Sequence, residues 1–226
     1  MKMDYKKEIV TRINSISGRY SSYEVFTDWV KCCSLSIDNY TTLFHDFAWH
    51  KKEQEYLNLV KKYENDEIKI FSDMLGMLCL ALEKKMEDVL GWIYMASRMG
   101  SKAAGQFFTP YHLSELCANL TIPDPQEDGK IYLYEPSCGG GGMIIASVAA
   151  LKNKGFDYQN NLEVIAQDLD WKGVHMCYLQ LSLLGVKAVC VQGDTLQEPY
   201  TRGYAKERML YTPAKKGLIT WMSEVN

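Results

Sequence analysis

The chain has 226 residues, a length typical of one large domain or two small ones. Hydrophobic residues make up 47% of it and charged residues 23%, which excludes a mainly disordered chain. The formal net charge is -3, so bulk charge does not favour nucleic-acid binding, which would need a local basic patch or a partner subunit.

The first part of the chain, up to about residue 100, contains no proline and little glycine. Its apolar residues recur at helical spacing, as in the stripe Tyr56, Leu59, Val60 and Tyr63. The periodicity predicts helices over 5–15, 22–33, 40–63, 66–85 and 87–98. We therefore expect an all-helical domain over residues 1–100, whose apolar stripes pack against one another.

The second part, residues 101–226, has a different pattern. Short β-rich runs at 131–134, 162–166 and 188–191 alternate with helical stretches at 142–153 and 171–184. The alternation predicts an α/β domain with right-handed βαβ units and a parallel sheet. Residues 218–221 are a candidate fourth strand, and the polar stretch 197–216 is predicted to be a long surface loop.

The segment Glu135-Pro-Ser-Cys-Gly-Gly-Gly-Gly-Met143 lies between a predicted strand and a predicted helix. Four consecutive glycines cost backbone entropy, and close approach of a ligand at the carboxyl edge of a parallel sheet is a physical reason for them. The alternative is a flexible loop. The segment lacks the Lys-Ser/Thr ending of a P-loop, so a triphosphate is disfavoured.

Acidic residues follow the next two predicted strands. Asp168 ends the second strand, where a carboxylate can accept hydrogen bonds from both hydroxyls of a ribose; the alternative is a helix cap. Asp170 is the better candidate for that cap. Asp194 follows the third strand and could accept from an adenine amine, although Gly193-Asp194 is also a common turn.

An aromatic segment, Gly105-Gln-Phe-Phe-Thr-Pro110, precedes these motifs. Thr109 and Pro110 predict the N-cap and first turn of a helix over 111–120. Phe107 and Phe108 could pack over a ligand or into the core.

Together these segments resemble the adenine-N6 DNA methyltransferases of the type I restriction-modification kind, in their modification subunits. The family signatures are matched by 105–110, by 135–142, by Gln167-Asp168 with the helix ending in Leu183-Leu-Gly-Val186, and by Gly193-Asp-Thr-Leu196. The resemblance implies a helical N-terminal domain followed by a Rossmann-like S-adenosylmethionine-dependent methyltransferase core.

The resemblance also implies roles for particular residues in binding S-adenosylmethionine. Glu135 and the glycines, Gly139 and Gly141 among them, would line the methionine end of the cofactor. Asp168 would hold the ribose and Asp194 the adenine. Phe107, Phe108 and Thr109 would close over the methionine moiety, and Pro136, Ser137, Cys138, Leu169 and Thr195 complete the expected set.

The sequence departs from the family in one respect. These enzymes hold the flipped adenine with an Asn/Asp-Pro-Pro-Phe/Tyr motif, and no such tetrapeptide occurs in the 226 residues. We therefore expect an incomplete sheet, no assignable catalytic residue, and a chain that needs a partner to methylate DNA. The alternatives are a catalytically inactive S-adenosylmethionine-binding regulator or scaffold and, less favoured, a methyltransferase for a small molecule or protein.

The remaining features concern location and assembly. Seven cysteines without a Cys-x-x-Cys pair, and no secretory signal, predict reduced thiols in the cytoplasm. The four histidines show no metal-ligand spacing, and no apolar run is long enough to span a membrane, so we expect neither metal nor membrane. A short sheet leaves an exposed edge, which favours a homo- or hetero-oligomer.

Overall fold

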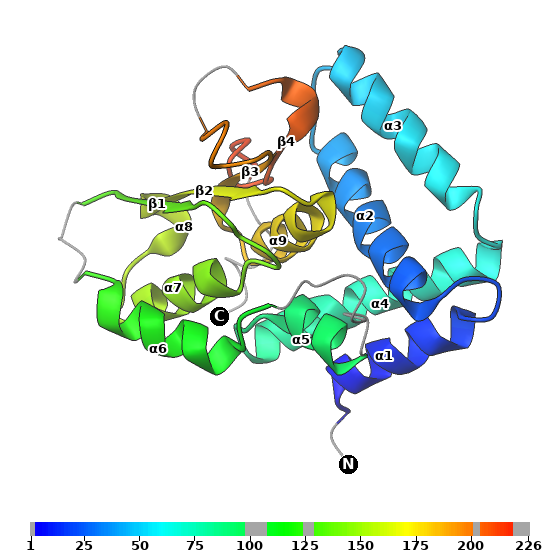
Figure 1. The fold of residues 1–226 in the computed structure, drawn as a ribbon, viewed down its shortest axis with the longest axis horizontal. Coiled ribbons are helices and arrows are strands. Elements are labelled where there is room, and N and C mark those ends of the chain that lie inside the picture. Colours follow the sequence, from blue (N-terminus) through cyan, green and yellow to red (C-terminus); the bar gives the residue numbers. More distant parts are fainter. Residues whose placement is uncertain (1–2, 98–107, 124–128, 201–203, 219–226) are drawn as a thin grey trace.

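The structure, a computed structural model, describes residues 3–97, 108–123, 129–200 and 204–218. Helices fill the first of these ranges, as Figure 1 shows in blue to green. They are α1 (Tyr5–Ile16), α2 (Ser22–Tyr40), α3 (Phe47–Val60), α4 (Asn65–Lys84) and α5 (Val89–Ala96). The predicted helical character of this part is therefore confirmed. Of the apolar stripe in and after α3, only Tyr63 is buried, while Tyr56, Leu59 and Val60 are partly buried against the core.

The boundary between the second and third helices differs from the prediction. The helix predicted over 22–33 continues to Tyr40, and the one predicted over 40–63 begins only at Phe47. The hydroxyls of Thr41 and Thr42 donate to carbonyls of the last turn of α2, and the Asp46 carboxylate accepts from the Trp49 N–H to cap α3. These polar side chains separate two helices that apolar periodicity alone merged.

The second part of the chain is mixed α/β, as expected. In chain order it contains α6 (Tyr111–Thr121), β1 (Ile131–Glu135), α7 (Gly142–Asn153), α8 (Tyr158–Asn161), β2 (Leu162–Asp168), α9 (Trp171–Leu183), β3 (Lys187–Gln192), a 3-10 turn (Lys206–Arg208) and β4 (Met209–Tyr211). The four strands form one sheet in the order β1-β2-β3-β4. The first three are parallel, which brings their carboxyl ends to one edge of the sheet.

The fourth strand of the described sheet lies outside the candidate predicted at 218–221. It forms at Met209–Tyr211, inside the predicted loop, and pairs antiparallel with β3 through Cys190 and Leu210. Leu218 has no regular structure, and residues 219–221 lie outside the described ranges. Thr212, the residue directly after β4, fastens the end of that strand to β3. Its hydroxyl accepts from the Ala188 N–H and donates to the Val186 carbonyl. A three-residue strand carries too little alternation to be recognised in a polar stretch.

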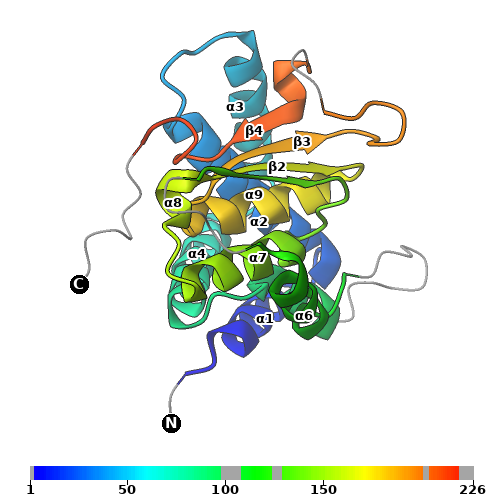
Figure 2. The ribbon, with the colours of Figure 1, turned by 90° about the vertical axis from the view of Figure 1, so that its left-hand side faces the viewer.

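Helices cover one face of the sheet. Viewed edge-on in Figure 2, α7 and α9 lie on the same side of it, and α2 packs against the far side of α9. Tyr132 of β1, an edge strand among the described residues, is 74% exposed.

The core is continuous across residue 100. Trp29 and Tyr94 from the helical part and Tyr178 from α9 are fully buried in the same cluster. The division into two domains at that point stays a prediction.

Two features are absent from the described residues, a membrane-spanning helix and a cluster of metal-ligand side chains. None of the helices in these ranges is both long and apolar enough to cross a bilayer. No group of three or more His, Cys, Asp or Glu side chains in the same ranges is placed to hold a metal ion.

Candidate functional site

The glycine-rich loop connects β1 to α7 at the carboxyl edge of the sheet. Gly139 and Gly141 have positive φ angles of 49° and 91°, which residues with a Cβ rarely adopt. The Cys138 N–H donates to the Gln167 carbonyl at 2.9 Å, so the loop is fastened to the end of β2. This geometry explains why glycine is needed at two of the four positions.

Crowding by the protein itself explains the other two glycines. A Cβ added to Gly142 would lie 3.1 Å from Asp88 Oδ2, and one added to Gly140 would lie 3.1 Å from the Met176 methyl group. Both neighbours are buried, so they have little room to yield. The glycine run therefore answers to packing as well as to any ligand.

Asp168 ends β2 and is mostly buried. Its Oδ2 accepts from the Gly139 N–H at 2.8 Å and its Oδ1 accepts from the Asp170 N–H at 2.9 Å. Asp170 in turn caps α9 by accepting from the Lys172 N–H, as predicted. Asp168 therefore joins the glycine-rich loop to the turn after β2.

A cavity of about 270 Å³ opens beside this carboxylate. Six of the predicted site residues line it, namely Phe108, Thr109, Ser137, Cys138, Gly139 and Asp168. Asp88, Ser114, Gly140, Gly142 and Met143 complete the lining. We call this the glycine-loop cavity. The remaining aromatic of the segment, Phe107, lies outside the described residues.

Other predicted residues lie near the same sheet edge but do not line the cavity. The Glu135 carboxylate accepts from the Ser137 N–H, and the Thr195 hydroxyl donates to the Pro136 carbonyl at 2.6 Å. Asp194 accepts from the Leu196 N–H within its own turn.

Leu169 and Gly141 are also predicted site residues that do not line the cavity. The Leu169 side chain is exposed to solvent. An added Cβ on Gly141 would lie 3.1 Å from the Cys177 sulfur.

Thr109 does not cap the helix that follows it. Helix α6 begins at Tyr111 with Pro110 as its cap residue, and no side chain accepts from the first turn. Pro110 has a ψ angle of 130°, which is extended rather than helical, so the predicted Thr109 cap is wrong by one position. Thr109 instead borders the cavity.

Sequence reasoning missed Asp88, which comes from the helical part of the chain. Its Oδ1 accepts from the Gly91 N–H and from Gln180 Nε2, both at 2.8 Å. Gln180 Nε2 also donates to the Gly140 carbonyl at 2.8 Å, which links α5, α9 and the loop. The spacing Asp-x-x-Gly signals a helix cap, but no local signal places that cap behind a loop about fifty residues later.

The electrostatics of the glycine-loop cavity are one-sided. Burial raises the pKa of Asp88, while its hydrogen bonds from Gln180 and Gly91 oppose the shift. A hydrogen bond with Cys177 and full burial both raise the pKa of the Cys138 thiol, which keeps it neutral. Among the described lining residues there are two carboxylates and no Lys, Arg or His.

A glycine turn after the first strand, with an acid after the second, is the arrangement typical of nucleotide-binding α/β domains. The family model of the N-6 DNA methylases matches residues 85–212, more than half of the chain, and the chain belongs to that family. The match begins at Lys85, so Asp88 and α5 lie within it.

The chain also matches solved structures, and no curated protein matches it. One solved structure is the type I restriction-modification methyltransferase subunit from Streptococcus thermophilus, with 12% identity over 88% of this chain and 59% of that chain, and a TM-score of 0.45. Another is a putative class I S-adenosylmethionine-dependent methyltransferase from Listeria monocytogenes, with 11% identity over 92% and 66% of the two chains and the same TM-score. The chain spans less than two thirds of either protein.

Proposed function

We propose that this chain is the S-adenosylmethionine-binding component of a DNA adenine-N6 methyltransferase. The observation that carries the proposal is the position of Asp168, a mostly buried carboxylate at the end of β2 that borders a cavity under a glycine-rich loop. Membership of the N-6 DNA methylase family supplies the reaction class.

The donor set of the cavity fits the nucleoside part of this cofactor. Each Asp168 oxygen accepts one backbone N–H, and a carboxylate has about four acceptor positions. One position on each oxygen is therefore left for the two ribose hydroxyls. Asp194 and Thr195 are proposed to face the adenine from the end of β3.

The cationic part of the cofactor fits the charge of the same cavity. S-adenosylmethionine carries an α-ammonium and a sulfonium group, and we assign the ammonium to Asp88. Asp88 has hydrogen bonds only from neutral donors among the described residues, so its negative charge has no cationic partner there. Phe108 and Thr109 are proposed to close over the methionine end, with Phe107 beside them.

When bound, the cofactor supplies an electrophilic methyl group. The residues of this chain bind and orient it: Asp168 fixes the ribose, the loop fixes the aminoacyl end, and the buried aromatic Phe108 excludes water. The adenine acceptor is proposed to be held by a partner chain, in a cytoplasmic complex with DNA. The exposed Tyr132 face of the sheet and its free β1 edge, among the described residues, favour such a partner or a second copy.

The binding half of the proposal is tested by calorimetry with S-adenosylmethionine. Loss of charge-assisted hydrogen bonds in Asp168→Ala should weaken binding by about 1.5–3 kcal/mol, roughly tenfold or more. Asp170→Ala is the matched control, because Asp170 caps α9 next to Asp168 but does not line the cavity. Equal affinities for wild type and Asp168→Ala would refute the ribose assignment.

The role of Asp88 needs a ligand series, because substitution could also disturb the loop. Asp88→Asn should weaken binding of S-adenosylmethionine and S-adenosylhomocysteine about tenfold, since both carry the ammonium. It should leave 5′-methylthioadenosine unchanged, since that ligand has no aminoacyl group. A loss confined to S-adenosylmethionine would assign Asp88 to the sulfonium instead, and an equal loss for all three would make its role structural.

The transfer half is tested with tritiated S-adenosylmethionine and adenine-containing DNA. We expect methylated DNA only when the partner chain is added. A second candidate function, a cofactor-binding regulator or scaffold, is favoured by the exposed Tyr132 face, and it predicts cofactor-dependent assembly without any DNA methylation.

A further inference from the structure

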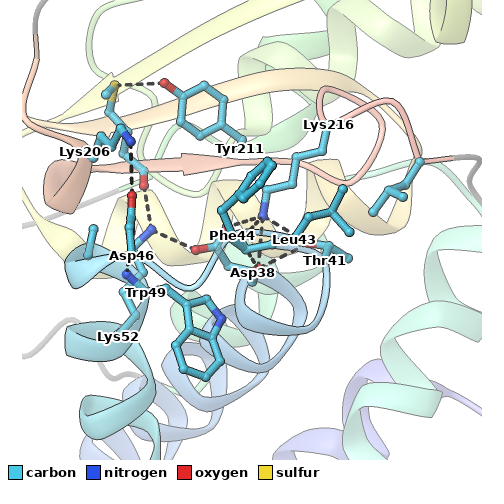
Figure 3. A pocket seen from close by; sticks show the side chains of 14 residues that line it. Asp38, Thr41, Leu43, Phe44, Asp46, Trp49, Lys52, Lys206, Tyr211 and Lys216 are labelled. Atoms are coloured by element: carbon cyan, nitrogen blue, oxygen red, sulfur yellow. Dashed lines mark hydrogen bonds and ion pairs between the residues drawn. The ribbon is translucent and has the colours of Figure 1, made fainter.

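A second cavity, of about 420 Å³, lies between the α2–α3 connection and β4. Figure 3 shows its lining, with the Lys216 ammonium between Asp38, Leu43 and Phe44. No residue of it lines the glycine-loop cavity. We call it the lysine cavity, and its volume lies in the range of small-ligand sites.

A buried ion cluster forms the inner wall of the lysine cavity. Asp38, only 3% exposed, pairs through Oδ2 with Lys52 at 2.8 Å and through Oδ1 with Lys216 at 2.7 Å. Two lysines around one carboxylate leave one excess positive charge. Burial lowers the pKa of Lys216, opposed by Asp38 and reinforced by Lys52. An unpaired buried charge is costly, so the cluster favours an additional anion.

Lys52 and Lys206 have N–H donors left for a ligand, whereas Lys216 does not. The Lys216 ammonium donates to the Thr41 and Thr42 hydroxyls as well as to Asp38. Lys52 donates to Asp38 and to the Met209 carbonyl, so one of its three N–H groups has no acceptor among the described residues. Lys206, at the rim, donates only to Asp46 in the same ranges.

The outer wall is apolar and partly aromatic. Leu43 and Phe44 are 83% and 82% exposed, and Tyr211 and Trp49 also border the cavity. Large hydrophobic side chains this exposed at a cavity mouth are unusual for a surface loop and are typical of a binding site. The cavity thus combines ring faces with ammonium donors.

We propose that the lysine cavity binds a nucleotide unit, with its phosphate held by Lys52 and Lys206 and its base packed against Phe44 and Tyr211. Aromatic stacking with charge-assisted phosphate contacts is how proteins hold single nucleotides and unpaired strands. The chain as a whole is acidic, at -3, so a local cluster of lysines is what nucleotide binding requires of it. A free nucleotide and the end of a nucleic-acid strand present the same chemistry.

The probe is thymidine 5′-monophosphate, which lacks the adenine and the 2′-hydroxyl that the glycine-loop cavity would recognise. We expect calorimetry to give a Kd below about 1 mM, with thymidine and inorganic phosphate each at least about tenfold weaker. Saturating S-adenosylmethionine should not change this Kd. Displacement by S-adenosylmethionine, or equal affinity for inorganic phosphate alone, would overturn the proposal.

Three variants locate the site. Lys52→Met should raise the Kd about tenfold and leaves Asp38 paired with Lys216, so the fold should persist. Phe44→Ala should raise the Kd about fivefold through lost stacking, and the fold should persist because Phe44 is exposed. Lys51→Met is the matched control, because Lys51 is the exposed neighbour of Lys52 and lines a different cavity. Equal effects of Lys51→Met and Lys52→Met would refute the assigned contact.

Comparing the affinity for an oligonucleotide with that for the mononucleotide distinguishes a strand end from a free nucleotide as the ligand. A 5′-phosphorylated oligothymidylate that binds more tightly than the mononucleotide assigns the site to a strand end. Equal affinity assigns it to a free nucleotide, and both results support the site. No measurable binding of either probe would overturn it.

Discussion

The two cavities of this molecule differ in the way each surrounds a buried aspartate. In the glycine-loop cavity, Asp88 accepts hydrogen bonds from an amide side chain and a backbone N–H, with no cation among the described lining residues. In the lysine cavity, Asp38 is paired with Lys52 and Lys216. The first leaves excess negative charge and the second excess positive charge.

The difference shows that burial of a carboxylate does not by itself indicate its role. Asp38 completes an ion cluster whose members need one another, whereas Asp88 has no cationic partner among the described residues. The same substitution, Asp to Asn, should therefore have opposite consequences for stability in the two places.

The largest effect is expected for Asp38→Asn. The substitution leaves the partly buried Lys52 and Lys216 without their buried counter-ion, and breaking a buried pair in this way costs about 3–5 kcal/mol of the free energy of unfolding. Urea denaturation at pH 7 measures it. Asp46→Asn is the control, because its pair with Lys206 is exposed and should contribute much less. Similar losses for the two variants would contradict the idea of a cooperative buried cluster.

The next largest effect is the pH dependence of the free energy of unfolding that comes from His175, which lies near Lys31 and Lys52. Burial and, to a smaller extent, the charges of Lys31 and Lys52 together lower the pKa of His175 to about 3. A neutral histidine in the folded state contributes stability above the unfolded pKa, about 6.5, and that stability is lost as the pH falls. Between pH 7 and pH 5 we expect a loss of roughly 2 kcal/mol that is absent in His175→Gln. Parallel stability curves for the two proteins would contradict this assignment.

The sequence predicted the glycine-loop side of the molecule well, because its signals are local. A glycine run between a strand and a helix, and Asp168 at a strand end, can be recognised within a few residues. Asp88 and Gln180 could not be found in this way, because their pairing depends on how α5 packs on α9. The lysine cavity was missed for the same reason, since Asp38, Lys52 and Lys216 come from three distant elements.

A smaller effect separates backbone strain from crowding in the glycine loop. Gly141→Ala places a Cβ at a φ angle of 91° and 3.1 Å from the Cys177 sulfur, whereas Gly155→Ala has a φ angle of 77° with open space around it. The left-handed conformation alone costs about 1–2 kcal/mol, so both variants should lose that much in urea denaturation. The additional loss in Gly141→Ala measures how tightly α9 holds the loop, and its absence would show that Cys177 yields.

The smallest expected effect is that of Asp88→Asn on the protein without cofactor. Burial raises the pKa of Asp88 in the folded state, so its stabilising contribution is present below its unfolded pKa and is lost as the pH rises through the folded pKa. Asparagine does not ionise, so the difference in free energy of unfolding, Asp88→Asn minus wild type, should increase with pH across that window. Urea denaturation over a pH series measures the difference and cancels the contributions of other groups. Saturating S-adenosylmethionine should then reverse the sign, because an ammonium beside Asp88 favours the charged form. A difference that decreases with pH would mean that Asp88 already has a cationic partner, and the contrast between the two cavities would no longer hold.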